Sequence, residues 1–405
     1  MNILFLSIGD IPSIKHREIY PDLLREFVKN HHNVYVVCSR ERRKNLPTEV
    51  VKEDGATLIK VRIGNITKTN LIEKGISTLL VNALYKRAIK KYLSHVRFDL
   101  VMYSTPPITL VDCIEYVKQR DHAKTYLLLK DIFPQNAVDL GMFHQTGLKS
   151  LIYHYFRNKE SKIYRVSDHI GCMSPANVDF VLKHNPELMP EKVEICPNSI
   201  EIIDKSIHDD KRRSIREKYD IPFDKKVFIY GGNLGKPQGI DFLIACLKRL
   251  KDQKEMFFLI IGDGTEYSKL QRYMQEEKPS NMRLQKRLPK DDYDTMVAAC
   301  DVGMIFLDHR FTIPNFPSRI LGYMQARIPV LACTDPNTDV GKVITEGGFG
   351  WWCESNSVDN FARIISDICS LDLKPLGDNG YRLLNEKYAV QKSYDIIMKH
   401  FHIND

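Results

Sequence analysis

The sequence predicts an α/β protein built from two doubly wound parallel sheets. Short apolar runs rich in β-branched and aromatic residues alternate with helical patterns from one end of the chain to the other. Near-continuous hydrophobic strands separated by helices are typical of parallel sheets that are covered on both faces. A chain of 405 residues, of which 43% are hydrophobic and 27% charged, is too long for one ordinary core. It fits two domains of about 150–200 residues each.

The expected strands follow this alternation in order. In the first half they are residues 2–8, 33–39, 57–63, 100–105, 125–132, 169–174 and 193–198, and in the second half 226–233, 256–264, 282–288, 302–307 and 329–335. A strand ends at Pro197-Asn198-Ser199 and the charged segment 204–220 follows, so a domain boundary is expected between them. The predicted domains are therefore 1–200 and 201–380, followed by C-terminal helices over 381–405.

Composition excludes several classes of protein. The nine cysteines are scattered and form no CxxC motif or Cys/His cluster, so neither a disulfide framework nor a zinc site is indicated. The start, MNILFLSIGDIP, has no basic region before its apolar residues and indicates a buried first strand and not a signal peptide. No apolar run approaches the roughly 20 residues of a membrane span, so a cytoplasmic protein is expected. The net charge of +8 suits anionic substrates or an anionic membrane surface, and no nucleic-acid motif accompanies it.

A glycine-rich loop leaves the first strand of the second half. The segment 228–240, FIYGGNLGKPQGI, contains Gly231, Gly232, Asn233, Leu234, Gly235 and Lys236. Three glycines in five residues permit positive φ angles and a close approach of backbone to a ligand. The alternative is a tight turn between a strand and a helix that contacts nothing. With Lys236 beside it, the loop is a candidate site for an anion.

A second candidate loop precedes a helix in the segment 311–335. Ser318 and Arg319 open that helix after Pro314-Asn315-Phe316-Pro317. Proline at a helix start is structurally ordinary, and Ser318 is also a plausible helix cap. An arginine there is able to grip a phosphate in fork geometry, which capping does not explain. Two such loops in one half of the chain indicate a pocket for a diphosphate, and a nucleotide-sugar is the expected ligand.

Polar residues also follow strands in the first half. Lys130-Asp131 ends the strand YLLLKD, just before Phe133-Pro134. Ligands bind at the carboxyl ends of strands in open α/β sheets, and an aspartate there is able to orient or deprotonate a substrate hydroxyl. The alternative is an N-cap for the following helix. His16 and Arg17, after the Gly9-Asp10 turn, are candidates to line the same cleft.

Taken together, these motifs resemble the retaining glycosyltransferases of family four, which have the GT-B fold. The resemblance is carried by YGGNLGKPQG, IGDG, PNFPSRILGYM and PVLACTD, and by LLLKDIFPQNAVDLG in the first half, and it extends over nearly the whole chain. Within the family the chain is most similar to the surface-polysaccharide branch typified by WbuB, an N-acetyl-L-fucosamine transferase. The resemblance implies two Rossmann-like domains that face each other across a cleft, with the last helix crossing back to the N-terminal domain.

The resemblance also implies the substrates. The C-terminal domain would bind a UDP-sugar as co-substrate, with Asn315 and Phe316 near the sugar and Arg287 and Leu288, which follow Lys286, near the base. No metal is implied, because basic side chains and a helix N-terminus neutralise the diphosphate. The acceptor would be a saccharide on a polyprenyl diphosphate, bound by the N-terminal domain. A solvated basic pair at residues 286–287 remains the alternative at that position.

The pair Gly262 and Gly264 is a further candidate in the second half. These glycines end a buried strand in the sequence IGDG, where a ligand contact and a structural turn both account for them. No residue-level feature of the sequence separates the two interpretations.

The chain departs from the family pattern at several positions. The two glutamates that the family places eight residues apart fall on Pro314 and Gly322. The usual arginine and lysine of the loop after the first C-terminal strand fall on Asn233 and Gln238. Lys236 lies nearby and is a candidate to take over the role of that lysine. The WbuB-like branch shares this substituted pattern, which favours an active variant.

A basic amphipathic segment in the first half is a candidate membrane contact. Residues 75–97 place Tyr85, Ala88, Ile89, Tyr92, Leu93 and Val96 on one side of a helix and Lys86, Arg87, Lys90 and Lys91 on the other. Such a helix is able to lie on anionic lipid, which would make the protein peripheral on the inner face of the cell membrane. The alternative is a sheet-covering helix with a solvated face. The aromatic-basic segment 153–157 is a second candidate.

The sequence therefore predicts a retaining transferase that moves a sugar from a UDP-sugar to a lipid-linked saccharide in capsule, O-antigen or exopolysaccharide biosynthesis. Asp131, Lys236 and Arg319 are its expected catalytic residues. Two alternatives remain open. A UDP-sugar 2-epimerase shares the fold but needs carboxylates and a histidine that converge on one sugar. A non-catalytic nucleotide-sugar-binding scaffold is favoured only by the missing glutamates.

Overall fold

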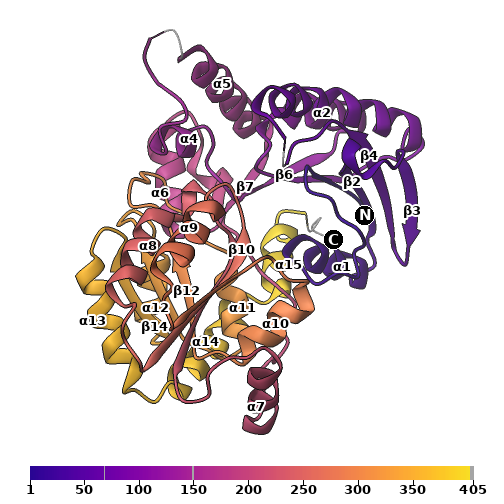
Figure 1. The fold of residues 1–405 in the computed structure, drawn as a ribbon. Helices are drawn as coiled ribbons and strands as arrows, with labels where there is room; N and C mark the ends of the chain where they lie inside the picture. Colours follow the sequence, from indigo (N-terminus) through magenta and orange to yellow (C-terminus); the bar gives the residue numbers. More distant parts are fainter. Residues whose placement is uncertain (68, 148–149, 402–405) are drawn as a thin grey trace. The chain divides into compact units, whose positions relative to one another are not determined.

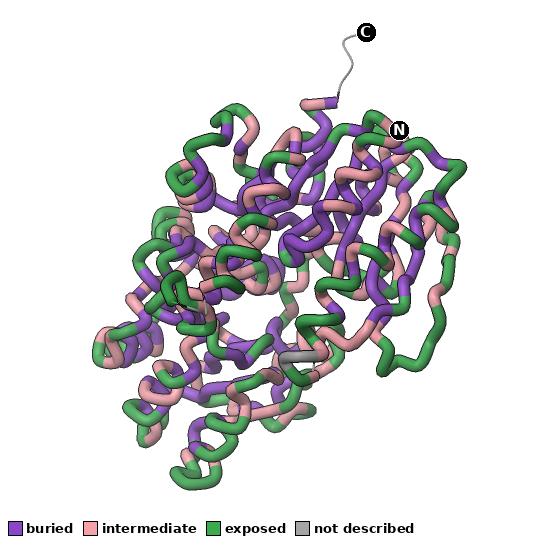
Figure 2. Tube along the Cα trace, turned by 90° about the horizontal axis from the view of Figure 1, so that it is seen from above, coloured by how far each residue is buried: buried purple, intermediate pink, exposed green. Residues whose placement is uncertain are grey.

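The computed structural model describes residues 1–67, 69–147 and 150–401 (Figure 1). The chain divides into two compact units, each with its own sheet. The first unit contains Met1–Glu201 and the segment that begins at Val390, and the second contains Ile202–Ala389. Buried residues concentrate in the strands, and exposed residues lie on loops and on the outer turns of helices (Figure 2).

Within the described residues, the first unit has an eight-stranded sheet in the order β3-β4-β2-β1-β5-β6-β7-β8. Its strands are β1 (Asn2–Ser7), β2 (Asn33–Glu41), β3 (Glu49–Glu53), β4 (Ala56–Ile63), β5 (Leu100–Ser104), β6 (Lys124–Leu129), β7 (His169–Cys172) and β8 (Val193–Ile195). Neighbouring strands run parallel, except that β3 pairs with β4 in the antiparallel direction. The sheet therefore presents the carboxyl ends of β4, β2, β1, β5 and β6 at one edge.

The helices of the first unit cover this sheet. They are α1 (Ile19–Lys29), α2 (Leu71–Tyr92), α3 (Val111–Asp121), α4 (Gln135–Asp139), α5 (Ser150–Val166), α6 (Pro175–His184) and α15 (Val390–Met398), with the short 3-10 turn η1 (Arg42–Lys44) after β2. The central strands β1, β5 and β6 are almost wholly buried, as apolar strands covered on both faces must be.

The second unit has a six-stranded sheet, counted over the part of the chain that the structure describes, in the order β11-β10-β9-β12-β13-β14. Its strands, all paired in parallel, are β9 (Lys226–Asn233), β10 (Met256–Asp263), β11 (Met282–Gln285), β12 (Val302–Phe306), β13 (Val330–Thr334) and β14 (Gly350–Glu354). Its helices are α7 (Asp209–Lys218), α8 (Ile240–Arg249), α9 (Tyr267–Glu277), α10 (Lys290–Ala298), α11 (Arg319–Gln325), α12 (Val340–Glu346), α13 (Val358–Cys369) and α14 (Lys374–Lys387).

The two sheets confirm the predicted fold class, because each unit is a Rossmann-like α/β layer structure. Two strands, β3 and β14, were not among those expected from the sequence. The expected strand over residues 282–288 ends at Gln285.

The C-terminal helices divide between the units. Helix α14 lies in the second unit, and the return to the first unit begins at Val390 and not at residue 381. The Val390 N–H donates to the Ile200 carbonyl at 2.9 Å, and the ring of Tyr394 packs edge-on against Phe27 with centroids 5.0 Å apart. These contacts fix α15 on the first unit. No helix in the described part of the chain is long and apolar enough to cross a bilayer.

Candidate functional site

The strand order of the second unit reverses at β9. From β9 the chain moves to β10 and β11 on one side, and then returns to β12, β13 and β14 on the other side. Loops that follow strands on either side of such a switch point diverge, and ligands of open α/β sheets bind there. The loop after β9 and the loop between β12 and α11 are the two that the sequence singles out.

These two loops are joined to each other by direct contacts. The N–H of Asp308 donates to the Pro237 carbonyl at 3.0 Å, and Arg319 Nη1 donates to the Gly231 carbonyl at 2.9 Å. Gly239 has a φ of +57°, and a Cβ there would lie 3.3 Å from the Asp308 Cα. The loops are therefore one packed structure at the carboxyl edge of the sheet.

Arg319 is the best-positioned cation of this structure. Its guanidinium carbon lies 4.5 Å from the ring centroid of Tyr230, so the side chain stacks on β9 as well as bonding to it. A guanidinium offers five N–H donors in a fixed fork, and the bond to Gly231 uses one of them. Gly232, with a φ of +130°, leaves room for the group, because a Cβ there would lie 3.3 Å from Nη2.

Two tyrosines at this site were not identified from the sequence. Tyr230 supplies the ring beneath Arg319, and its hydroxyl donates to the Asn233 carbonyl at 2.8 Å. Tyr293, on α10, covers Gly231 so closely that a Cβ there would lie 1.9 Å from the phenol oxygen. Burial raises the pKa of Tyr293 well above its usual value, so its hydroxyl stays protonated. The only sequence signals are that Tyr230 precedes the glycines of the β9 loop and that Tyr293 lies in the first turn of α10.

The loop after β9 is held by one glutamine. The side-chain oxygen of Gln238 accepts from the Gly235 N–H at 3.2 Å and from Asn233 Nδ2 at 2.9 Å. The N–H of Gly235 and the amide of Asn233 are thus engaged within the loop, and their predicted contacts with a ligand would have to replace these bonds. Lys236 is exposed and forms no ion pair with any described residue. Lys236 is thus the exposed cation of this loop, whereas Arg319 is held by the Gly231 carbonyl and the Tyr230 ring.

Packing explains the glycines at the end of β10. A Cβ on Gly262 would lie 2.1 Å from the Gly232 carbonyl oxygen, and one on Gly264 would lie 2.4 Å from the Leu234 carbonyl oxygen. Both neighbours are backbone atoms, which are not free to move aside. Packing alone therefore requires glycine at both positions, and a ligand contact of either residue stays a prediction.

We expect Gly262→Ala to destabilise the protein and to weaken nucleotide binding. The methyl group would push the β9 loop away from β10, and overpacking of this kind costs about 1–3 kcal/mol. Chemical denaturation measures the loss of unfolding free energy, and calorimetry with UDP measures the loss of affinity. Gly322→Ala is the matched control, because no atom lies within 4 Å of the position of its Cβ. In the helix α11 that change should be neutral or stabilising. Equal stability of the two variants would contradict the packing argument.

The loop between β12 and α11 is braced from the loop after β13. The buried carboxylate of Asp335 accepts from the N–H and the hydroxyl of Thr338, both at 2.9 Å. The same hydroxyl accepts from the N–H of Asn315 at 3.1 Å. Asn315 also donates from Nδ2 to the Ile313 carbonyl at 3.2 Å, and it stays partly exposed. The loop that carries Asn315 is therefore rigidly held.

Phe316 and Ser318 lie in the same loop, and their contacts with a ligand stay predictions. The Phe316 side chain is only 3% exposed and lies 5.9 Å from the ring of Tyr388, so only its backbone is available to a ligand. Ser318 occupies the N-cap position of α11, but its side chain makes no capping bond and is exposed. The capping interpretation therefore does not account for this serine.

Arg287 and Leu288 follow β11, two strands away from β9. Arg287 is exposed and Leu288 is partly buried. Their neighbour Lys286 places its ammonium 4.1 Å from the ring centroid of Tyr267, so it is not simply a solvated cation. Both Lys286 and Arg287 are exposed cations of this loop, and Lys286 also contacts an aromatic ring.

In the first unit, Asp131 lies at the carboxyl end of β6. Helix α4 has Pro134 as its N-cap, so Asp131 does not cap it. Its carboxylate accepts instead from Asn136 Nδ2 at 2.9 Å, and its own carbonyl accepts from the Thr105 hydroxyl at 3.1 Å. Burial raises the pKa of Asp131 to about 6, while the bond from Asn136 lowers it. Asn136 and Thr105 were not identified as candidates from the sequence, although Asn136 lies in the segment LLLKDIFPQNAVDLG.

The other candidate residues of the first unit are Lys130, His16 and Arg17, and their surroundings differ from those of Asp131. The adjacent Lys130 turns inward, where its Nζ lies 3.4 Å from the Cys196 carbonyl and burial lowers its pKa. His16 and Arg17 are exposed in the loop after β1. Arg17 lies 3.5 Å from the Glu201 carboxylate, which makes it part of a weak surface ion pair. The structure brings both residues to the same sheet edge as Asp131.

A metal site is not formed by the residues that the structure describes, which hold no group of three or more His, Cys, Asp or Glu side chains suited to a metal ion. Among the candidate residues of the second unit, Arg319 and Lys236 are the cations nearest the loop after β9.

Comparisons with known proteins indicate the class of enzyme. Residues 211–381 match the model of "Glycosyl transferases group 1". A probable glycosyltransferase WbjE from Pseudomonas aeruginosa is 28% identical over 329 residues, which are 80% of this chain and 78% of the relative. A putative colanic acid biosynthesis glycosyl transferase, WcaI from Escherichia coli K12, is 31% identical over 114 residues, 28% of this chain and 27% of the relative.

The fold is similar to that of solved structures as well. HepE from Anabaena, solved in complex with UDP-glucose, superimposes with a TM-score of 0.72 at 14% identity and covers 99% of both chains. At this identity the likeness concerns the fold alone. The two Rossmann-like sheets have the GT-B fold, and the glycosyl transferase match over the second unit, with the similarity to WbjE, indicates a glycosyltransferase.

Proposed function

We propose that the protein transfers a sugar, with retention of configuration, from a UDP-sugar to a lipid-linked saccharide during synthesis of a surface polysaccharide. The observation that carries the proposal is Arg319, whose guanidinium is fixed at the switch point of the second unit by the Gly231 carbonyl and the Tyr230 ring. A rigid cation there suits the diphosphate of a nucleotide-sugar. The names of two similar proteins support the substrates: HepE was solved with UDP-glucose, and WcaI is a putative colanic acid biosynthesis glycosyl transferase.

In this proposal the cations of the second unit stabilise the departing UDP. Negative charge grows on the diphosphate as the bond to the sugar breaks, and donors fixed in advance stabilise such charge most. The departing phosphate itself accepts the proton of the acceptor hydroxyl, so no protein nucleophile is needed. Basic side chains and a helix N-terminus neutralise the diphosphate in place of a metal. Asp131 in the first unit orients that hydroxyl when it is ionised.

Lys236→Ala is expected to weaken UDP binding about tenfold while leaving the fold intact. A charge-assisted hydrogen bond is worth about 1.5–3 kcal/mol, and the exposed, flexible side chain should give the lower end of that range. Isothermal calorimetry with UDP measures the change, and Lys248→Ala, on the neighbouring helix α8, is the control. An unchanged affinity would remove Lys236 from the donor site.

The proposed function is tested by incubating the protein with UDP-sugars, with and without a polyprenyl-diphosphate-linked saccharide. A transferase releases UDP rapidly only when the acceptor is present, and it should do so in EDTA. An epimer formed without acceptor would indicate a UDP-sugar 2-epimerase, and binding without turnover would indicate a scaffold. Loss of activity in EDTA that magnesium restores would overturn the metal-free mechanism.

The sugar itself is proposed to be an N-acetylated amino or deoxyamino sugar such as N-acetyl-L-fucosamine, on the basis of the resemblance to the WbuB-like branch. A thermal-shift screen against a panel of nucleotide-sugars identifies it, because a bound ligand stabilises by RT ln(1 + [L]/Kd). The largest shift should come from such a UDP-sugar. A larger shift with UDP-glucose or with a GDP-sugar would correct the assignment.

We also propose that the protein binds reversibly to an anionic membrane. The structure changes the kind of contact that we expect. From Tyr85 onward the apolar side of α2 is buried in the first unit, with Tyr85 and Ile89 at 0% exposure, so this part of α2 covers the sheet and does not insert into lipid. Its cations remain at the surface, although Lys86 and Lys90 lie 4.8 and 5.0 Å from the Tyr116 ring. Contact through this face would therefore be electrostatic.

Co-sedimentation with anionic liposomes is expected to fall as ionic strength rises. Each cation near an anionic surface contributes about 1 kcal/mol, and salt screens that attraction. Replacing Lys86, Arg87, Lys90 and Lys91 with glutamine should reduce binding strongly at low salt. If the variant sediments like the parent, the contact lies elsewhere. The exposed side chains of Leu151, Ile152 and Tyr155 on α5 would then be the next to replace.

A further inference from the structure

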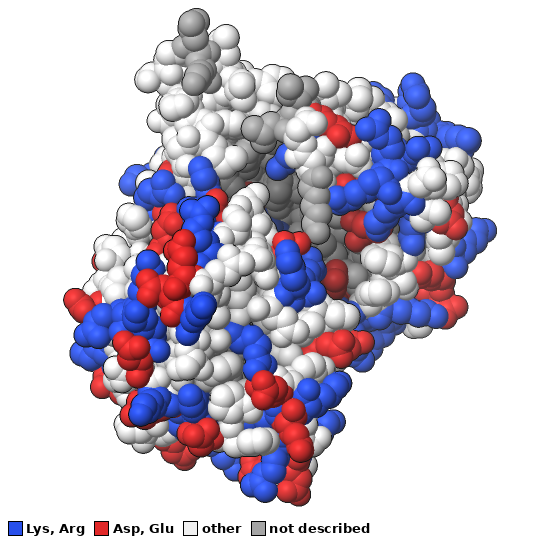
Figure 3. Space-filling model, viewed as in Figure 1, with Lys and Arg blue, Asp and Glu red and all other residues white. Residues whose placement is uncertain are grey.

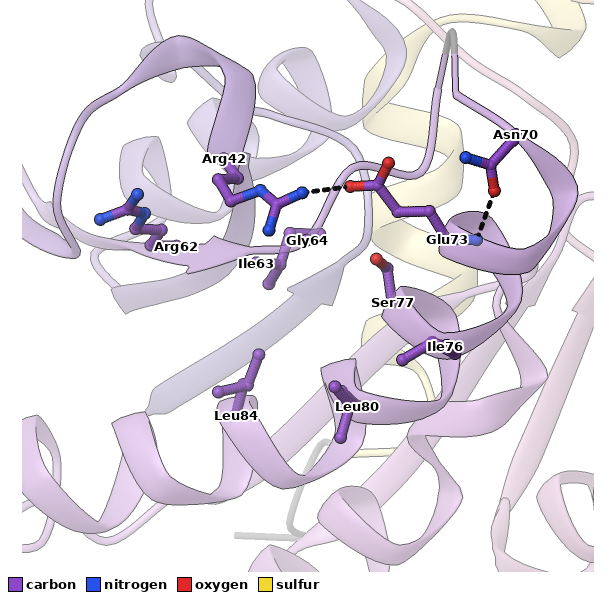
Figure 4. Close-up of a pocket in the computed structure, with 10 residues that line it drawn as sticks. All are labelled: Arg42, Arg62, Ile63, Gly64, Asn70, Glu73, Ile76, Ser77, Leu80 and Leu84. Carbon is purple, nitrogen blue, oxygen red and sulfur yellow. Dashed lines mark hydrogen bonds and ion pairs between the residues drawn. The ribbon is translucent and has the colours of Figure 1, made fainter.

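A groove in the first unit lies apart from the residues assigned above. It has a volume of about 790 Å³ and is lined by α2 through Ile76, Leu80 and Leu84, by the end of β4 through Arg62 and Ile63, and by Arg42 of η1. Figure 4 shows α2 along one side of this α2 groove, with β4 and the segment of Arg42 along the other. The volume falls within the range of about 300–1,000 Å³ that is typical of ligand sites.

One wall of the α2 groove is apolar and open to water. Ile76 is 55% exposed and Leu80 is 53% exposed, and Leu84 is partly exposed beside them. The apolar residues of helix α2 thus differ in exposure, because Val81, Tyr85 and Ile89 are buried in the core, whereas Ile76 and Leu80 are not. Large apolar side chains that remain exposed and contiguous within a concave surface mark a place for an apolar ligand.

The other wall of the α2 groove is cationic. Arg42 Nη2 lies 2.8 Å from Glu73 Oε1, so these two charges offset each other. Arg62 is exposed, and its guanidinium forms no ion pair or hydrogen bond with the described residues. The lining therefore carries one uncompensated positive charge, and Lys and Arg side chains gather over the part of the molecule that bears α2 and β4 (Figure 3). A ligand that matches both walls is an anionic amphiphile.

The groove opens at the sheet edge where the acceptor is proposed to bind. Gly64 directly follows β4 and passes so close to α2 that a Cβ there would lie 2.1 Å from Ser77 Oγ. The groove therefore opens at the carboxyl end of β4. Since β4, β2, β1, β5 and β6 run parallel, this is the sheet edge that also carries His16 and Asp131.

We propose that the α2 groove binds the lipid diphosphate of the acceptor, with its hydrocarbon against Ile76, Leu80 and Leu84 and its diphosphate at Arg62. The saccharide would then extend along the sheet edge toward Asp131. This inference rests on the proposed function, because it assigns a position to one part of that function's acceptor. A concave site with one uncompensated cation matches a single lipid diphosphate. Binding to a bilayer surface would instead require a flat protein face with several charges.

Binding of farnesyl diphosphate to the full chain tests the α2 groove directly. Isothermal calorimetry should show that this probe binds at least tenfold more tightly than farnesol or inorganic diphosphate, because each of these matches only one wall. Leu80→Asp and Arg62→Gln should each weaken binding at least tenfold. Two controls are matched in kind: Leu79→Asp changes a leucine of α2 that is 48% exposed but does not line the groove, and Arg87→Gln removes an exposed arginine of α2 outside it.

Controls that lose as much affinity as the groove variants would overturn the proposal, as would equal binding of inorganic diphosphate. Vesicles of phosphatidylcholine and phosphatidylglycerol separate the acceptor from bulk lipid. Leu80→Asp should sediment with them like the parent. If it loses vesicle binding but keeps farnesyl diphosphate, the groove serves bulk lipid and the proposal is wrong.

Kinetics separates failure of the groove from failure of the proposed function. Leu80→Asp should raise KM for a lipid-linked acceptor at least tenfold, while kcat with a soluble acceptor and affinity for UDP stay unchanged. A parent protein that binds no UDP would overturn the proposed function, yet the calorimetry with farnesyl diphosphate would still decide the groove. Equal loss with the soluble acceptor would show that Leu80 acts on the catalytic edge and not on the lipid.

Discussion

Replacing Arg319 with alanine is expected to lower turnover by about a hundredfold or more and to weaken UDP binding at least tenfold. Removing one fixed donor to a developing negative charge costs about 10²–10³ in rate in enzymes that depend on it. A charge-assisted bond to the bound diphosphate contributes about 1.5–3 kcal/mol to affinity. Steady-state kinetics with the lipid-linked acceptor and calorimetry with UDP measure the two effects.

The second role of Arg319 requires its own control. Its bond to the Gly231 carbonyl and its stacking on Tyr230 also hold the end of β9, so loss of activity has to be separated from loss of structure. Arg319→Lys keeps the charge but loses the fork and the stacking, and it should recover part of the UDP affinity and little of the turnover. Arg272→Ala, an exposed arginine of α9, should behave like the parent. Unchanged UDP affinity in Arg319→Ala would place the diphosphate elsewhere.

The fold could be predicted because its strands are apolar enough to stand out. The strand β9 and the central strands of the first sheet are buried on both faces, and their sequences show it. The two missed strands lie at or near sheet edges and lack that pattern. β3 has the sequence EVVKE, with three charged residues in five, and β14 carries two partly exposed tryptophans. Tertiary pairing and not local preference makes them strands.

The site could be predicted only in part. The sequence identified Arg319 because a basic residue after prolines at a helix start is a recognisable pattern. It could not show that Gly262 and Gly264 make room for the β9 loop, because a glycine that admits a ligand and a glycine that admits another segment look the same. It also missed Tyr293, whose contact with Gly231 joins residues 62 positions apart along the chain.

Phe316 is a second residue whose role at the site could not be predicted from the sequence. The family pattern places this residue near the sugar, but its ring is buried against Tyr388, which the chain reaches only after β14 and two further helices. Motifs specify which residues are near a site, and packing decides which of their atoms face it. For this reason the side chain of Phe316 packs in the core, and only its backbone is available to a ligand.

Asp131→Asn is expected to lower turnover about 10²–10⁴-fold, the usual contribution of a positioned acid–base group, and to remove an acidic limb from the pH profile. Because burial raises the pKa of Asp131 to about 6, the carboxylate is protonated below that pH and ionised above it. Only the ionised form accepts a hydrogen bond on both oxygens, so kcat/KM of the parent should rise with pH through about 6 and level off near neutrality. Kinetics between pH 5 and 8 measures this.

The matched control is Asp179→Asn, which removes an exposed carboxylate of α6 and should leave both rate and profile unchanged. UDP affinity should also be the same in Asp131→Asn as in the parent, because the donor contacts are proposed for the second unit. Asn136→Ala provides an intermediate case: it removes the bond that lowers the pKa of Asp131, so the acidic limb should move to higher pH. A limb that persists in Asp131→Asn would assign the titration to another group. The carboxylate would then be a structural partner of Asn136 and not a catalytic residue.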